Sequence, residues 1–319
     1  MLTGKTLLIT GGTGSFGQAF CREALTKDVK QVRIFSRDEL KQAQMKEEIN
    51  DARVEYLCGD VRDAQRLSTA LEGVDTVIHA AAMKRIEKCE KDPQEAIKTN
   101  VLGSVNVANA CLKNNVKNAI LISTDKAVYP VNHYGATKLV SEKVWVQSNV
   151  YRGATHPTRF SVVRYGNVLG SRGSVLQLFK DQLEKGSLKV TDANMTRFFI
   201  TLQEAVDLVQ VALEMHQGGE IFLPNLKAAS IYHLATLVAG DVPVEITSQR
   251  GGEKLHEALI TKEERSRLAS YQHFSVINPE ITTWPYEKWT SEFINFVESS
   301  EKAEQYSDGE LRTLLAAAS

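Results

Sequence analysis

The sequence predicts an α/β protein, with a doubly wound parallel sheet and a smaller α+β domain toward the C-terminal side. Three observations support this fold class. Short apolar runs alternate with helical segments through the first half of the chain, a glycine-rich turn directly follows the first run, and the alternation weakens beyond residue 167. Strands that alternate with helices are typical of a parallel sheet with right-handed crossovers.

Six short apolar runs are predicted as strands of this sheet, because turn residues follow them. They span residues 6–10, 31–35, 54–58, 74–79, 118–123 and 160–165. Farther along the chain, the pattern predicts a return helix at 198–214 and a last strand at 220–223.

These elements divide the chain into two predicted domains. Residues 1–167, with a return segment at about 198–225, form the first domain, and residues 168–197 and 226–319 form the second. The polar stretch 299–308 is expected to be loosely ordered, and a short helix is expected at 309–318.

The overall charge excludes some classes of partner. Lys and Arg number 38 against 39 Asp and Glu, and the formal charge of −1 indicates neither nucleic acid nor an anionic membrane. The start lacks a signal-peptide pattern and no run reaches the roughly 18 apolar residues that span a bilayer, so we expect a cytoplasmic protein. The cysteines form no C-x-x-C pair, which indicates free thiols and no metal site. They are Cys21, Cys58, Cys89 and Cys111.

A G-x-x-G-x-x-G turn joins the first predicted strand to a helical segment. This is the phosphate-binding arrangement of a dinucleotide fold, because glycines allow close approach and a helix N-terminus offers free N–H groups to a pyrophosphate. The predicted cofactor-binding residues here are Gly11, Thr13, Gly14, Ser15, Phe16 and Gly17.

The end of the second predicted strand bears on which dinucleotide binds. An acidic residue there favours a free ribose 2′-hydroxyl, whereas Ser36, Arg37 and Lys41 suit a 2′-phosphate. We therefore favour NADP over NAD. The alternative is that Arg37 and Lys41 belong to a solvated helix start.

Later strand ends supply further candidates. Asp60, followed by Val61, is placed to accept from the adenine amine, and the small side chains of Ala80, Ala81 and Ala82 would let a cofactor lie against the backbone.

Three polar residues follow or end the same strands. Asn100 is expected to open a helix at the carboxyl edge of the sheet, where ligands of such folds bind. Lys84 is either a substrate contact or a solvated loop residue. His79 is expected to pack beside the cofactor and not to act as a base.

The fifth predicted strand ends at the residues that carry the chemistry, Thr124, Asp125 and Lys126, and Tyr134 and Lys138 follow. Tyr134 and Lys138 are four apart, so on a helix they share one face, and the cation is expected to lower the pKa of the phenol. Each pair also has a simpler interpretation: Tyr134 and Lys138 as surface residues, and Asp125 and Lys126 as a structural salt bridge.

Several motifs together resemble the extended short-chain dehydrogenase/reductases (SDRs), which have a Rossmann fold. They are the glycine turn, Asp60-Val61, Ala80 to Ala82, Asn100 and Tyr134-x-x-x-Lys138. Within that class the chain resembles the inverting UDP-N-acetylglucosamine 4,6-dehydratases, through Thr124-Asp125-Lys126, Met83-Lys84, Met195-Thr-Arg197-Phe198 and a motif from Arg250 to Glu257.

The resemblance implies a set of catalytic roles. Tyr134, tuned by Lys138, takes the proton from the sugar 4-hydroxyl, Lys126 is the base at C5, Asp125 is the acid for the departing 6-hydroxyl, and Thr124 bonds the substrate. Both members of the Asp125–Lys126 pair then need shifted pKa values, a raised carboxyl and a lowered amine. Their proton arrangement is coupled and stays open.

The resemblance also implies a substrate and an assembly. The substrate is UDP-N-acetylglucosamine, and the enzyme is a homo-oligomer between a dimer and a hexamer. The implied substrate-binding residues are Lys84, Asn167, Arg172, Val175, Thr196, Arg197, Arg250 and Glu253. A nucleotide-sugar 4-epimerase is the enzymatic alternative, and a non-catalytic NADP-binding scaffold is the alternative of another class.

Overall fold

The computed structural model describes residues 2–153, 155–248, 251–292 and 296–317. Its largest sheet has the strand order β13-β14-β10-β6-β5-β4-β1-β2-β3. The strands from β3 to β10 in this order are parallel, and β14 and β13 extend the sheet antiparallel. Their bounds are β1 Thr6–Thr10, β2 Gln31–Ser36, β3 Val54–Cys58, β4 Thr76–His79, β5 Asn118–Thr124, β6 Arg159–Tyr165, β10 Ile221–Pro224, β13 Leu268–Ser270 and β14 Phe274–Ile277.

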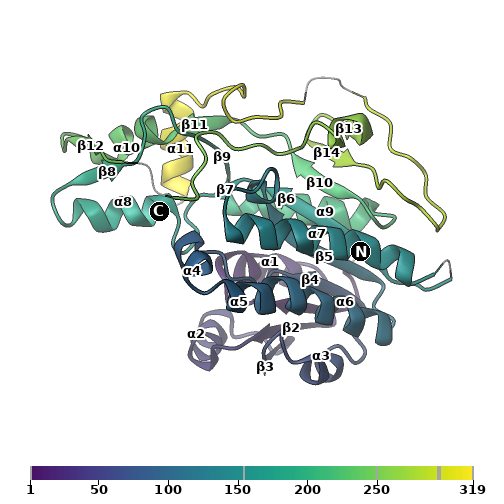
Figure 1. The fold of residues 1–319 in the computed structure, drawn as a ribbon. Coiled ribbons are helices and arrows are strands. Elements are labelled where there is room, and N and C mark those ends of the chain that lie inside the picture. Colours follow the sequence, from purple (N-terminus) through teal and green to yellow (C-terminus); the bar gives the residue numbers. More distant parts are fainter. Residues whose placement is uncertain (1, 154, 249–250, 293–295, 318–319) are drawn as a thin grey trace.

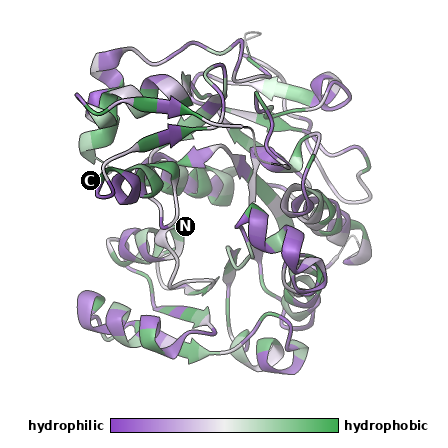
Figure 2. Cartoon of the chain, turned by 60° about the vertical axis from the view of Figure 1, so that its left-hand side comes forward, coloured by the Kyte–Doolittle hydropathy of each residue, from purple (hydrophilic) through white to green (hydrophobic). Residues whose placement is uncertain are grey.

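Helices cover both faces of this sheet (Figure 1), and each face buries its own apolar cluster. On one face lie α1 Ser15–Leu25, α2 Glu39–Ile49 and α9 Leu202–Met215; on the other lie α3 Ala64–Ala70, α6 Gly103–Lys113 and α7 His133–Tyr151. Hydrophobic residues accordingly concentrate in the strands and on the helix sides turned toward them (Figure 2). The predicted doubly wound α/β fold is therefore confirmed.

A smaller group of elements lies beside the carboxyl edge of the sheet (Figure 1). It contains a three-stranded sheet, β11-β9-β7, and a two-stranded sheet, β12-β8, packed with three helices around a separate apolar cluster. The bounds are β7 Asn167–Val168, β8 Leu188–Val190, β9 Thr196–Ile200, β11 Ala228–Ser230, β12 Val244–Ile246, α8 Val175–Leu183, α10 Ile231–Ala239 and α11 Asp308–Ala317. Shorter helical segments are α4 Ile86–Lys91, α5 Pro93–Ala96, η1 Ile97–Leu102, η2 Asp125–Ala127 and η3 Glu264–Arg267.

Two sequence predictions about these elements are wrong. The predicted helix 198–214 contains the end of strand β9, which pairs with β11, and the helix α9 begins only at Leu202. A capping box between Thr201 and Glu204 starts it there. The stretch 299–308 is packed: Ser300 and Ala303 are buried, and the backbone N–H of Tyr306 donates to Ala228.

The predicted domain boundaries stay a prediction. β10 joins the main sheet as expected, and so do β13 and β14, although they follow residue 226.

Within the described ranges, no helix combines the length and apolar character needed to cross a bilayer. The four cysteines are free thiols, with Cys58 exposed and the others buried.

Candidate active site

The strand order reverses between β1 and β4, which are neighbours in the main sheet. β1 leads through the glycine turn into α1, and β4 leads into the segment that begins at Ala80. Ligands of open α/β sheets bind outside the carboxyl ends of the strands at such a switch point. The fold therefore places the glycine turn and the three alanines at the same edge.

The glycine turn packs so closely against its neighbours that side chains at Gly11 and Gly17 would clash with the backbone. Gly11 has φ +66°, and a Cβ there would meet the Ala81 Cα at 2.8 Å, while a Cβ at Gly17 would meet the Gly12 Cα at 2.5 Å. The N-cap of α1 is Gly14, which has no side-chain capping bond. The first N–H groups of α1 are therefore available to an anion, and the turn fits a dinucleotide pyrophosphate.

The predicted 2′-phosphate residues lie at the end of β2, but protein groups already contact them. The Ser36 hydroxyl accepts from Gln42 Nε2 at 3.0 Å. Arg37 lies 3.6 Å from Asp60, and Lys41 lies 2.7 Å from Asp38, which caps α2. Both cations keep about half of their side chains exposed, so they can reorient toward a phosphate.

Asp60 also binds Arg62 through two bonds to one carboxylate oxygen, at 2.6 and 2.9 Å. Burial raises the pKa of Asp60, but the bonds from Arg62 outweigh burial and the pKa lies below its usual value. The neighbouring Val61 is buried, and a Cβ at Gly103 would meet its side chain at 2.7 Å.

Asn100 lies within a π-helical turn and does not open the helix as predicted. Its amide accepts from the Met83 N–H at 2.7 Å and donates to the Met83 carbonyl at 2.9 Å. It also donates to the Thr137 hydroxyl at 2.9 Å. Asn100 thus holds the segment after β4 against α7.

His79 is a buried structural residue, as its expected non-basic role requires. Its ring is hydrogen-bonded to Thr10 at 2.7 Å and to Ser104 at 3.1 Å, and it stacks on Trp145. Burial lowers its pKa to about 3, so the imidazole is neutral at physiological pH.

The end of β5 brings Thr124, Asp125 and Lys126 together. The Thr124 hydroxyl donates to Asp125 Oδ1 at 3.0 Å, and the Lys126 amine donates to the same oxygen at 2.9 Å. The side chain of Asp125 is fully buried, and its second oxygen, Oδ2, has no hydrogen-bond partner among the described residues. Burial raises the pKa of Asp125, as an acid requires.

The pKa of Lys126 shifts in the direction opposite to the predicted one. Burial acts to lower it, but the carboxylates of Asp125 and Glu257 outweigh burial and raise it. Glu257 Oε1 lies 3.5 Å from the Lys126 amine. Sequence reasoning did not include Glu257 among the site residues, although it ends the motif that begins at Arg250.

Tyr134 lies in the first turn of α7, close to this group. Burial, followed by the charge of Asp125, raises the pKa of its phenol, so the expected lowering by Lys138 is wrong. The Lys138 amine donates to the Ile122 carbonyl at 2.7 Å, and burial lowers its pKa to about 8.

Some predicted substrate residues converge on the site. Asn167 accepts from the Lys126 amine at 2.9 Å. Lys84 donates to the Arg172 carbonyl at 2.9 Å, and the Arg172 N–H donates to Ser15 Oγ at 3.0 Å. The loop after β7 therefore contacts the start of α1, and Val175 begins α8 directly after this loop.

Other predicted substrate residues serve protein contacts. The Thr196 hydroxyl bonds His256 and Ser300, each at 2.8 Å, and Glu253 accepts from Thr191 at 3.1 Å. Arg197 is buried, and its guanidinium donates to three backbone carbonyls, those of Thr196, Lys254 and Leu255. Arg250 lies outside the described residues. The substrate roles of these residues stay predictions.

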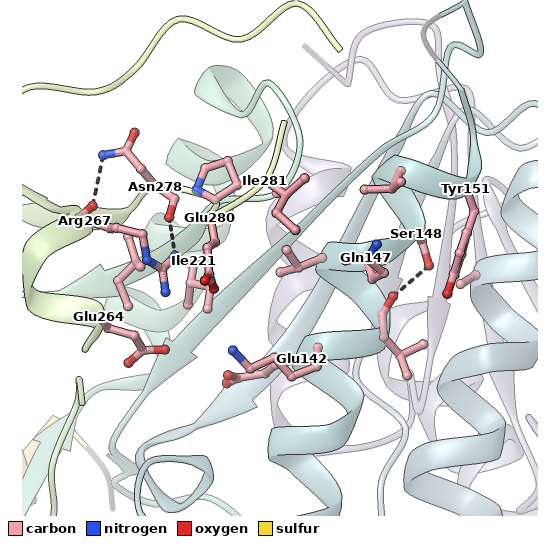
Figure 3. Close-up of a pocket in the computed structure, with 18 of the residues that line it drawn as sticks. Glu142, Gln147, Ser148, Tyr151, Ile221, Glu264, Arg267, Asn278, Glu280 and Ile281 are labelled. Atoms are coloured by element: carbon pink, nitrogen blue, oxygen red, sulfur yellow. Dashed lines mark hydrogen bonds between the residues drawn. The ribbon is translucent and has the colours of Figure 1, made fainter. Parts of the chain in front are cut away.

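A pocket of about 520 Å³ lies elsewhere, between α7 and the β13–β14 side of the sheet. Figure 3 shows Glu142, Gln147 and Tyr151 of α7 across from Ile221, Glu264 and Arg267. It contains none of the predicted site residues, so we assign it no part in the reaction.

The known proteins that match this chain include enzymes named for reactions of nucleotide sugars. The model of a family described as polysaccharide biosynthesis protein matches residues 7–279. A UDP-N-acetylglucosamine 4,6-dehydratase (inverting) of Campylobacter jejuni serotype O:23/36 is 47% identical over 284 residues, which cover 88% of this chain and 85% of that protein. A UDP-glucose 4-epimerase of Rickettsia bellii is 40% identical over 311 residues, 95% of this chain and 89% of the relative. The X-ray structure of Pen from Bacillus thuringiensis matches with a TM-score of 0.93 at 34% identity, covering 100% of this chain and 98% of that one.

Proposed function

The chain belongs to the polysaccharide biosynthesis protein family of extended SDRs, and from this premise we propose that it is a C5-inverting UDP-N-acetylglucosamine 4,6-dehydratase. It is an enzyme of the extended SDR family that modifies nucleotide sugars. The observation that carries the proposal is the buried Asp125–Lys126 pair, with a free Asp125 oxygen, beside Tyr134. A 4-epimerase needs no second base at C5, whereas elimination does.

The glycine turn at residues 11–17 would hold the dinucleotide, which would supply the hydride chemistry: acceptance from C4 and donation to C6. Tyr134 removes the proton of the 4-hydroxyl, and Lys138 beside it provides positive charge in its protonated form. Lys126 removes the C5 proton, which a 4-ketone makes acidic. Asp125 protonates the departing 6-hydroxyl, which leaves as water, and Thr124 bonds the substrate oxygen.

The pKa shift of Asp125 supports its role as the acid, whereas the pKa shift of Lys126 sets a condition on its role as the base. Burial raises the pKa of Asp125, which is the direction that a proton-donating carboxyl requires. The raised pKa of Lys126 means that its amine must lose a proton before it can act as a base. In the reacting form of the pair, the Asp125 carboxyl is therefore protonated and the Lys126 amine is neutral. Reprotonation at C5 from the opposite face gives the 4-keto-6-deoxy-L-sugar nucleotide.

The product formed in deuterated water tests the function. The protein, NADP and UDP-N-acetylglucosamine are incubated in D₂O and followed by NMR. A new C6 methyl group together with deuterium at C5 is the expected result. A 4-epimer without deuterium at C5 would instead support the second candidate, a 4-epimerase. This candidate is considered because the Rickettsia relative is named a UDP-glucose 4-epimerase.

Members of this group of nucleotide-sugar enzymes bind NAD or NADP. NADP is the cofactor of this proposal, because Arg37 and Lys41 flank the end of β2. A charge-assisted bond to a 2′-phosphate is worth about 1.5–3 kcal/mol, so NADP should bind at least about 10-fold more tightly than NAD. Titration of both dinucleotides checks this. Arg37→Ala should reduce the preference, Arg22→Ala on the surface of α1 should not, and equal affinities in the unaltered protein contradict the assignment.

The proposal includes a homo-oligomer and a diphosphate-binding role for Arg172 and Arg250. Exposed apolar side chains on η1 and α7, at Leu102, Val140 and Tyr151, support self-association. Light scattering on the purified protein should give at least a dimer. A monomer at micromolar concentration contradicts the assembly and leaves the reaction untouched.

A further inference from the structure

The Lys126 amine has an oxygen partner from each of three separate parts of the chain. Asp125 Oδ1 at the end of β5 lies 2.9 Å away, Asn167 Oδ1 on β7 lies 2.9 Å away, and Glu257 Oε1 lies 3.5 Å away. An ammonium group has three N–H donors, so it can address all three of these oxygens. Glu257 is 131 positions beyond Lys126 and reaches it only through the fold.

Glu257 is held rigidly in this position. Its side chain is 3% exposed, and its other oxygen accepts from the Lys254 amine at 3.0 Å. Arg197 Nε lies 3.9 Å from Oε1. Ser300 bonds the Glu257 backbone at both its N–H and its carbonyl. Lys254 in turn donates to the Val128 carbonyl at 2.6 Å, so the segment is fastened to the loop that follows Lys126.

The charged groups that face each other here are Asp125, Lys126, Arg197, Lys254 and Glu257, with the Tyr134 phenol beside Asp125. Glu257 is the one carboxylate of this set that contacts three cations. Burial acts to raise its pKa, but Lys126, Lys254 and Arg197 outweigh burial and lower it. Glu257 therefore stays ionised while the Asp125–Lys126 pair exchanges protons with the substrate.

We propose that Glu257 is a positioning residue for the elimination: its carboxylate orients the Lys126 amine and holds the Asp125–Lys126 pair in its singly protonated state over the working pH range. This inference rests on the proposed dehydratase function. In the elimination step, the C5–H electrons form the C5–C6 double bond, Lys126 gains the C5 proton, and the C6–O bond breaks as Asp125 gives its proton to make water. The step consumes a pair that carries one proton and leaves an ion pair.

The negative charge of Glu257 acts on both members of the pair in the same direction. It raises the pKa of Asp125 and the pKa of Lys126. Loss of this charge lowers both values, whichever residue governs each limb of the pH profile. Removal of Glu257's charge therefore moves the whole bell-shaped profile to lower pH, an effect that a purely structural role does not produce.

The test is the pH dependence of kcat/KM for elimination of water from UDP-N-acetylglucosamine in the Glu257→Gln variant. Both limbs should move down by about one to three pH units, the range for a charge within 4–6 Å. Glu257→Asp should give a profile between those of the Gln variant and the unaltered enzyme. Glu301→Gln is the control and should leave the profile in place, because Glu301 follows Ser300, which bonds the Glu257 backbone, and its own side chain is 60% exposed.

Three outcomes separate the possibilities. If elimination slows in Glu257→Gln and both limbs stay in place, the inference is overturned. If the Gln variant does not fold, as judged by circular dichroism, the Asp variant alone decides, and an unshifted profile overturns the inference. If the unaltered protein forms no 4-keto-6-deoxy product at any pH, the proposed function has failed, which is a different result from an unshifted profile.

Discussion

Gly135, in the first turn of α7, lies directly against the backbone carbonyl of Lys126, and a methyl group at residue 135 would overlap that oxygen. The Gly135 N–H donates to the Asn132 side chain at 2.7 Å, which caps the helix at this point. This contact brings the helix that carries Tyr134 next to the strand end that carries Asp125 and Lys126. The spacing between the two halves of the catalytic group depends on the absence of a side chain here.

Gly135→Ala should therefore reduce activity more than stability. The methyl group must push α7 away from Lys126, and a displacement of about 1 Å in a catalytic group can cost about 100-fold in rate. We expect a loss of about that size in kcat/KM for elimination, measured by NMR of the product. Gly309→Ala is the control, because a Cβ at Gly309 would meet no atom within 4 Å. Equal activities of the two variants would contradict this role of Gly135.

The parallel strands of the main sheet could be predicted because they carry a local signal, whereas the antiparallel strands β13 and β14 were not predicted. Each parallel strand is a short apolar run that ends in turn residues, and the strands at Thr6–Thr10 and Val54–Cys58 have the predicted bounds. Strand β9 has no such signal: its last three residues continue into an amphipathic helix, and its partner Ala228 is distant in sequence. Pairing between distant segments is a property of the fold that local patterns do not contain.

Glu257 was missed in the site because it comes from a distant part of the chain. Asp125, Lys126, Tyr134 and Lys138 lie close together in the sequence, so their meeting could be expected from helix and strand geometry. Glu257 joins them only because the segment after β12 packs across the sheet edge. The pKa shifts depend on this partner and on burial, which is why the predicted directions for Lys126 and Tyr134 were wrong.

Variants of the catalytic residues should separate the two half-reactions. Lys126→Met removes the C5 base and leaves Tyr134 in place, so C4 oxidation should continue while elimination stops. In a single turnover, reduced cofactor absorbing at 340 nm should accumulate without product. Tyr134→Phe should prevent this absorbance change, because the base for the 4-hydroxyl is lost. A Lys126→Met enzyme that eliminates water at the normal rate would remove Lys126 from its role.

Stability should fall as the pH drops below about 6.5, because two buried histidines must stay neutral. Burial lowers the pKa of His79 to about 3, and burial, aided by Arg159 and Arg152, lowers that of His216 to about 3. The unfolded chain takes up these protons near pH 6.5 and the folded chain does not. The free energy of unfolding is therefore not reduced by these histidines above pH 6.5. Below pH 6.5 it falls by up to about 1.4 kcal/mol per pH unit for each histidine.

Urea unfolding at several pH values between 7 and 5 measures this dependence, in a range where few carboxylates titrate. His216→Gln should reduce the slope of the unfolding free energy against pH by about the contribution of one histidine. This holds whatever the variant does to stability at pH 7. The ring resonances of both histidines should also show no titration in NMR spectra of the folded protein. An unchanged slope in the variant contradicts the assignment.

Arg164 is buried between two carboxylates. It binds Glu142 of α7 at 2.6 and 3.0 Å and Glu264 of η3 at 2.9 Å twice, and it donates to the Leu259 carbonyl at 2.8 Å. Glu142 and Glu264 appear on facing sides in Figure 3. Arg164→Met leaves both carboxylates buried without their cation, so unfolding should become easier by about 3–5 kcal/mol.

Urea unfolding at pH 7.5 checks this value against a matched surface pair. Lys189 lies 3.1 Å from Glu245, with about half of each side chain exposed, and Lys189→Met should cost at most about 1 kcal/mol. Combining Arg164→Met with Glu142→Gln and Glu264→Gln should recover part of the loss, because no unpaired charge then stays buried. If Arg164→Met lowers the free energy of unfolding no more than Lys189→Met does, the buried ion pairs do not stabilise the packing of the C-terminal segment on α7. The packing of that segment around Glu257 must then come from apolar contacts alone.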